Sequence, residues 1–128
     1  MRVTALIPAR YGSKGIKEKN IKKLLNEPLI SWTIKSAKES NCFDRIIVST
    51  DSKKIAKISR SYGAETPFLR PQSISKDDTP GISTVLHLIN NIKSVKWVCL
   101  LQPTSPLRTS DDIKSLINFA YKKKARSV

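Results

Sequence analysis

The sequence contains one histidine, two cysteines and no long apolar run, and each shortage excludes a class of function. With His87 as the only histidine, no Ser-His-Asp arrangement can be defended, and its place beside a helical apolar stripe favours a structural role. Cys42 and Cys99 lack a metal-binding spacing, so we predict reduced thiols, with Cys99 buried, and a cytoplasmic setting. No stretch reaches the roughly 20 apolar residues of a membrane span. The short apolar run at the N-terminus leads into Pro8 instead of a cleavage site, so we expect no signal peptide.

Acidic residues are also scarce. Ten Asp and Glu residues stand against 24 Lys and Arg residues, which gives a formal net charge of +14. Nucleic-acid binding is one interpretation of this excess. The lysines are spread over the whole chain, however, and no helix-turn-helix, zinc-finger or aromatic stacking motif accompanies them. We therefore favour a lysine-rich solvated surface and keep a nucleic-acid-binding domain as a third hypothesis.

The four glycines do not form a known phosphate-binding fingerprint. No G-x-G-x-x-G is present, and residues 12–15 do not fit a Walker loop. What is present is an apolar strand, residues 3–7, that breaks at Pro8 into the cationic loop 10–15. Six cations and one acid, Glu18, lie within residues 10–23. A strand that ends in such a loop before a helix suits the phosphates of a nucleotide.

Apolar periodicity predicts alternating strands and helices. We expect strands at about 2–8, 45–49, 65–69 and 97–101. Helices are expected from near Pro28, after an N-cap at Ser52, after Thr79-Pro80, and after a capping box at 109–112. The third helix has an apolar stripe at Ile82, Val85, Leu86 and Ile89. The last strand is continuously apolar, as expected for a central parallel strand covered on both faces.

This alternation predicts an α/β sandwich with a mainly parallel sheet. Ligands of such sheets bind beyond the carboxyl ends of the strands, so we expect function in segments 10–20, 49–52, 70–78 and 102–108. Asp51 is expected to cap the next helix or shape its turn in preference to binding a metal. The Asp77-Asp78 pair is likewise expected to belong to a capping loop.

Four segments together resemble the acylneuraminate cytidylyltransferase family. They are IPARYGSKG with Lys19-Asn20, FDRIIVSTD at 43–51, FLRP at 68–71 with DDTP at 77–80, and LLQPTSPLR at 100–108. The resemblance implies a truncated Rossmann-like nucleotidyltransferase sandwich, in which residues 1–128 form the nucleotide-binding domain at the N-terminal part of a longer fold. It also implies a reaction that joins CTP to N-acetylneuraminic acid or a related nine-carbon sugar acid and releases pyrophosphate, with magnesium.

The resemblance also assigns roles to residues. Arg10 and Lys14 would be catalytic, since they would surround the triphosphate together with Ser13, and Lys19 would add charge there. Asn20 would contact the nucleotide sugar or base, and Arg70 and Gln102 would contact the cytosine and ribose. The sugar acid would lie near three residues: Gln102, Ser105 and Arg108.

The sequence departs from the family in three places. Tyr11 replaces a small residue, Gly81 replaces a common serine, and the chain is about half as long as family members. The later half of the family fold carries the acidic pair that holds magnesium, much of the sugar-acid pocket and the homodimer contact. We therefore predict no metal ligand within these residues. A non-catalytic CTP-binding fragment is the alternative to an active enzyme.

Overall fold

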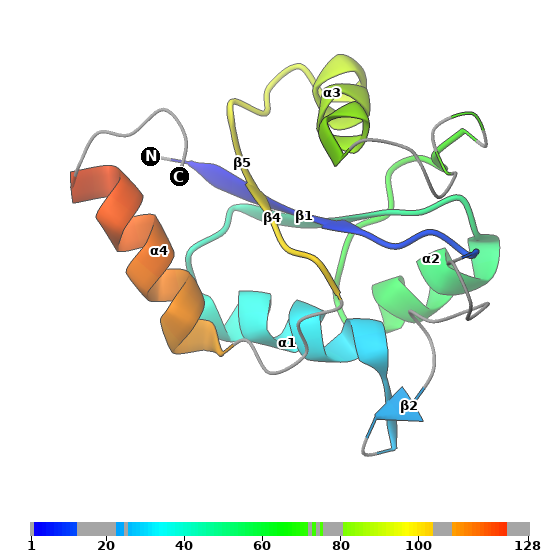
Figure 1. The fold of residues 1–128 in the computed structure, drawn as a ribbon, viewed down its shortest axis with the longest axis horizontal. Coiled ribbons are helices and arrows are strands. Elements are labelled where there is room, and N and C mark those ends of the chain that lie inside the picture. The colour runs from blue at the N-terminus through cyan, green and yellow to red at the C-terminus, as the bar shows by residue number, and fades with distance from the viewer. Residues whose placement is uncertain are drawn as a thin grey trace.

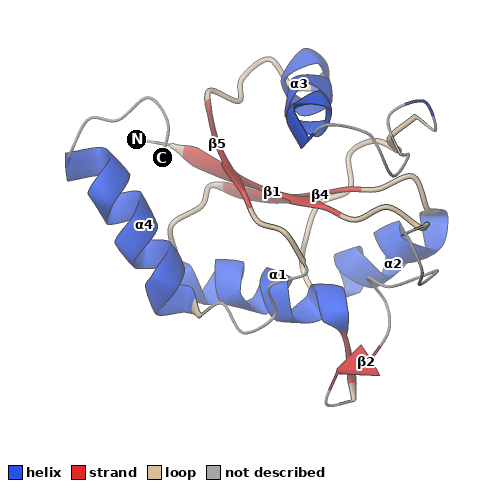
Figure 2. Cartoon of the chain, viewed as in Figure 1, coloured by secondary structure: helices blue, strands red, loops and turns tan. Residues whose placement is uncertain are grey.

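The computed structural model describes residues 2–12, 23–24, 26–71, 73, 75, 81–103 and 109–122. Its strands are β1 (Val3–Pro8), β2 (Lys23–Leu24), β3 (Glu27–Pro28), β4 (Arg45–Ser49) and β5 (Trp97–Leu100). Its helices are α1 (Leu29–Ser40), α2 (Lys53–Ser61), α3 (Gly81–Asn91) and α4 (Ser110–Lys122). Helices α1, α2 and α4 lie on one side of the main sheet, and α3 lies on the other (Figures 1 and 2). This layering confirms the predicted α/β sandwich.

The main sheet has the strand order β4-β1-β5, and both pairings are parallel. The register places Thr4 beside Arg45 on one side of β1, and Val3 beside Trp97 on the other. β2 and β3 form a separate antiparallel pair. Because β1 lies between the other two strands, the loop that follows it is flanked by the loops that follow β4 and β5.

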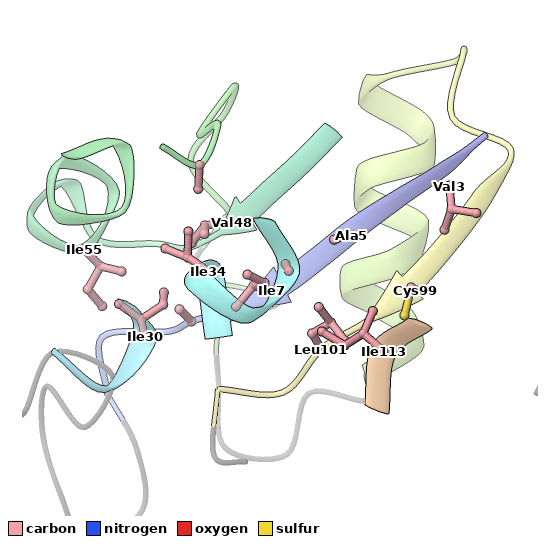
Figure 3. Close-up of a cluster of buried hydrophobic side chains, with 13 residues drawn as sticks. Val3, Ala5, Ile7, Ile30, Ile34, Val48, Ile55, Cys99, Leu101 and Ile113 are labelled. Carbon is pink, nitrogen blue, oxygen red and sulfur yellow. The ribbon is translucent and has the colours of Figure 1, made fainter. Parts of the chain in front are cut away.

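Alternation along β1 divides the core into two clusters. Val3, Ala5 and Ile7 are buried on the face covered by α1, α2 and α4, where they join residues such as Ile34 (Figure 3). Leu6 faces the opposite way and joins Ile47, Leu88 and Val95 beneath α3. A strand buried on both faces is rich in apolar residues throughout, as β1 is.

Local signals set the helix starts as the sequence predicted. The Ser52 hydroxyl accepts a hydrogen bond from the Ile55 amide at 3.2 Å and caps α2. The Thr109 hydroxyl accepts from the Asp112 amide, and the Asp112 carboxylate accepts from the Thr109 amide, both at 3.1 Å. This reciprocal pair is the expected capping box of α4. After α2 the chain turns at Gly63, whose φ of 97° a residue with a side chain rarely adopts.

Three expectations about the elements were wrong or incomplete. β5 is an edge strand within the described residues, not a central one, and Trp97 and Leu100 are both 38% exposed. Half of the predicted stripe of α3 is exposed, at Ile82 and Leu86, whereas Val85 and Ile89 are half-buried, because the helix rests on the sheet through Thr84 and Leu88. The expected strand at 65–69 is reduced to two isolated bridges, one from Glu65 to Ile47 of β4 and one from Leu69 to Thr50 just after β4.

Candidate nucleotide site at the carboxyl edge of the sheet

The segments that follow the strands are joined to one another by backbone hydrogen bonds. The Ala9 amide donates to the Ser49 carbonyl at 2.9 Å, and the Arg70 amide donates to the Thr50 carbonyl at 2.7 Å. The Leu101 amide donates to the carbonyl of Leu6 at 2.9 Å. The carboxyl edge therefore gathers the chain after β1, after β4, at residue 70 and after β5, which is the arrangement expected of a ligand site in a parallel sheet.

Arg70 is the most buried cation of this edge. Its side chain is 5% exposed, and its Nη1 donates a hydrogen bond to the Thr84 hydroxyl on α3 at 2.7 Å. Its Nε is buried without a partner among the described residues. Burial lowers the pKa of Arg70, the Asp51 carboxylate opposes that shift, and the charge of Arg10 adds to it. Asp51 and Arg10 therefore lie close enough to Arg70 for their charges to change its pKa.

Asp51 bridges two of the strand-end segments. Its Oδ1 accepts a hydrogen bond from the Tyr11 amide at 2.8 Å, although the two residues are 40 positions apart. The cap of α2 comes from Ser52 and not from Asp51. The expectation that Asp51 caps the helix was wrong, whereas a role in shaping the turn agrees with this contact.

His87 lies on α3, next to the Arg70 side chain. Its ring meets the Phe68 ring edge-on, with centroids 4.7 Å apart. Its Nδ1 is buried without a partner among the described residues. Burial, and secondarily the charge of Arg70, lowers the pKa of His87. These contacts support the predicted structural role.

The lowered pKa of His87 predicts a loss of stability in mild acid. The unfolded chain binds a proton more readily than the folded chain, so this contribution is complete above the ordinary histidine pKa and is lost as the pH falls from there through the lower pKa of the folded chain. Urea unfolding between about pH 7.5 and about pH 5 should show the free energy of unfolding falling more steeply in the parent than in His87→Gln. Equal slopes would contradict the prediction. Glu65, whose pKa Arg45 lowers by hydrogen bonding, acts only at more acidic pH.

The predicted site residues divide into two groups. Arg10 is half-buried, Arg70 is buried and Gln102 is exposed, and all three lie at the carboxyl edge. The other predicted residues fall outside the described part of the chain: Ser13, Lys14, Lys19, Asn20, Ser105 and Arg108. The Asp77-Asp78 pair and the Thr79-Pro80 cap also fall outside it. Thr84 is a residue of this edge that the sequence reasoning missed, since a threonine within an apolar helix gives no sign of the arginine it contacts.

The described residues do not offer a protein-made magnesium site. They contain no group of three or more His, Cys, Asp or Glu side chains that could hold a metal ion. Asp51 is the acid of this edge that acts on Arg70, and its Oδ1 already accepts a hydrogen bond. Magnesium requires several oxygen ligands in near-octahedral geometry.

None of the helices in the described segments has the length and apolarity that crossing a bilayer requires.

Comparisons with known proteins identify the family and the fold of the chain. A family model described as "Cytidylyltransferase" matches residues 4–128. CMP-N,N'-diacetyllegionaminic acid synthase of Legionella pneumophila is 42% identical over 121 residues, which cover 91% of this chain and 52% of the relative. N-acylneuraminate cytidylyltransferase of Escherichia coli is 39% identical over 112 residues, covering 88% of this chain and 26% of the relative. The chain thus spans about half of the first of these curated relatives and about a quarter of the second.

A solved structure has the same fold. It is that of CMP:2-keto-3-deoxy-manno-octonic acid synthetase complexed with CTP, with a TM-score of 0.83 and 18% identity. The alignment covers 98% of this chain and 49% of that one. The fold comparison confirms the Rossmann-like sandwich, and the family match confirms the resemblance in the sequence. The chain belongs to the cytidylyltransferase family.

Proposed function

We propose that the chain is the CTP-binding part of a cytidylyltransferase that joins CTP to N-acetylneuraminic acid or a related nonulosonic acid and releases pyrophosphate. The observation that carries the proposal is the gathering of Arg10, Arg70 and Gln102 at one edge of a parallel sheet. The names of the relatives support the substrate class, since they act on legionaminic, N-acylneuraminic and pseudaminic acids.

The proposed reaction requires cations around the phosphates. The anomeric hydroxyl of the sugar acid attacks the α-phosphorus of CTP, and the bond to the pyrophosphate leaving group breaks. Charge that develops on the phosphates is best stabilised by fixed cations in a partly desolvated site. We assign this work to Arg10 and Lys14, with Ser13 and Lys19 beside them.

Nucleotide recognition is assigned to a second set of residues. Arg70 is fixed by Thr84 and buried, so it would present a rigid cation toward the nucleotide. Gln102 can both donate to and accept from a base edge through its amide. We assign Asn20 to the nucleotide as well, and Ser105 and Arg108, with Gln102, to the sugar acid. Magnesium would be bound by the phosphate oxygens of CTP, because the described residues contain no group of side chains that could hold a metal ion.

A non-catalytic CTP-binding module is the second candidate. The observation that favours it is the coverage of the relatives, because half of a longer fold can retain a nucleotide site without the residues that complete the chemistry. A homodimeric assembly and a cytoplasmic location remain predictions for either candidate.

The test compares Arg10→Ala with a matched control, Arg2→Ala. Both variants lose one positive charge, but Arg2 precedes β1, and its side chain is 93% exposed. We expect Arg10→Ala to weaken CTP binding about tenfold or more, as measured by calorimetry, because it removes a charged contact to phosphate. Arg2→Ala should bind CTP as the parent does.

Pyrophosphate release from CTP, magnesium and N-acetylneuraminic acid then separates the candidates. Release that is lost in Arg10→Ala supports an active enzyme, and CTP binding without release supports the binding module. Equal loss of affinity in both arginine variants would contradict the proposed site. A steeply salt-dependent affinity for DNA or RNA, with no affinity for CTP, would support the nucleic-acid hypothesis instead.

A further inference from the structure

We infer that Asp51 is a positioning residue that holds Arg10 in place and thereby increases the affinity for CTP. The inference rests on the proposed function, in which Arg10 contacts the triphosphate. Asp51 is an unexpected component of this site, because a carboxylate repels the negative charge of CTP.

Two hydrogen bonds hold the backbone on either side of Arg10. The Ala9 amide donates to the Ser49 carbonyl at 2.9 Å, and the Tyr11 amide donates to Asp51 Oδ1 at 2.8 Å. The first bond continues the pairing between β1 and β4, and any residue at position 49 could accept it. The second depends on the identity of a side chain. Asp51 is therefore the side chain by which the loop after β4 fixes the loop after β1.

The two described residues that follow Arg10 have little side-chain packing around them. The Tyr11 side chain is 41% exposed, and an added Cβ at Gly12 would meet no atom within 4 Å. The hydrogen bond from the Tyr11 amide therefore attaches a loosely packed segment to the loop that follows β4. An amide fixed by a carboxylate is a strong form of this bond, because the acceptor is charged.

Two possible roles of Asp51 predict opposite changes in CTP affinity when its side chain is removed. Its carboxylate acts favourably on Arg70, whereas Arg10 and Arg70 repel each other. If Asp51 acted only through its charge, removing it would leave the site more positive, and CTP would bind more tightly. If Asp51 acts by holding the backbone at Arg10, removing it weakens binding. The two roles therefore predict opposite changes.

The experiment compares Asp51→Ala with Asp51→Asn. Both remove the charge, but asparagine keeps an oxygen that can accept from the Tyr11 amide. We expect Asp51→Ala to bind CTP about three- to tenfold more weakly, the size of effect that one hydrogen bond carries. Asp51→Asn should bind within about threefold of the parent or more tightly. Asp44→Ala removes the same charge just before β4, at the opposite end of the sheet, and controls for net charge.

Amide hydrogen exchange at Tyr11, followed by NMR without nucleotide, gives a second measurement. Exchange should be about tenfold faster in Asp51→Ala and unchanged in Asp51→Asn. Tighter CTP binding by Asp51→Ala, or unchanged exchange at Tyr11, would overturn the inference and leave the proposed function standing. If the parent binds no CTP, the proposed function fails, and the exchange rates alone decide whether Asp51 holds this segment.

Discussion

Leu6→Ala is expected to lower the free energy of unfolding by about 3 kcal/mol, among the largest effects of any single substitution in this chain. Leu6 is fully buried on the face of β1 toward α3, where it packs with Ile47, Leu88 and Val95. Truncation would remove buried methyl groups and leave a cavity that the neighbouring strand and helix cannot fill without moving. Total stabilities of about 5–15 kcal/mol are usual, so this loss is a large fraction of what holds the fold.

Leu100→Ala provides the matched control. Leu100 is the register partner of Leu6 on the adjacent strand, so the two leucines lie side by side on the sheet. Leu100 is 38% exposed, however, and its truncation should cost only about 1 kcal/mol. Urea unfolding of both variants and the parent measures the difference directly. Equal losses in the two variants would show that a further element covers the outer side of β5.

Thr84→Val is expected to destabilise the chain by about 1–3 kcal/mol, because it leaves a buried guanidinium group without its acceptor. Valine has nearly the shape of threonine but cannot accept from Arg70 Nη1. The cost is raised by the surroundings of Arg70, which is 5% exposed and has an Nε without a partner among the described residues. Thr84→Ser keeps the hydroxyl, so it should retain most of the stability.

The same pair of variants tests the link to the nucleotide. If Arg70 contacts CTP, Thr84→Val should also weaken CTP binding measured at a temperature where the variant is fully folded, and Thr84→Ser should restore it. A stable Thr84→Val variant with the affinity of the parent would mean that the hydrogen bond serves neither the fold nor the site.

Elements whose signals are local were predicted well from the sequence. Ile30, Ile34 and Ala37 recur at helical spacing and are all buried in α1. Ser52 and the Thr109-Asp112 pair specify helix starts through contacts within a few residues. Such signals are sufficient because the partner group is always close along the chain.

The failures concern relations between distant segments. The apolar run of β5 is typical of a strand with neighbours on both sides and both faces packed. It does not indicate whether the described residues contain a second neighbouring strand. Helix α3 meets the sheet through Leu88 and Thr84, and the Thr84 hydroxyl accepts from Arg70, a contact that the apolar pattern of the helix does not indicate. The partner of Asp51 could not be predicted either, since Tyr11 is 40 positions away.

The central place of β1 has a consequence for the order in which the chain folds. β1 is synthesised before both of its hydrogen-bonding partners, which begin at Arg45 and Trp97, so the two pairings close loops of about 40 and about 90 residues. Contacts of such long range slow folding and leave apolar strands exposed in the meantime. During synthesis the apolar side chains of β1 would stay unpaired until β4 and then β5 leave the ribosome. The backbone contacts that fix Arg10 would form only after β4 has joined β1, so the nucleotide site would be completed well after the residues of its first loop have been made.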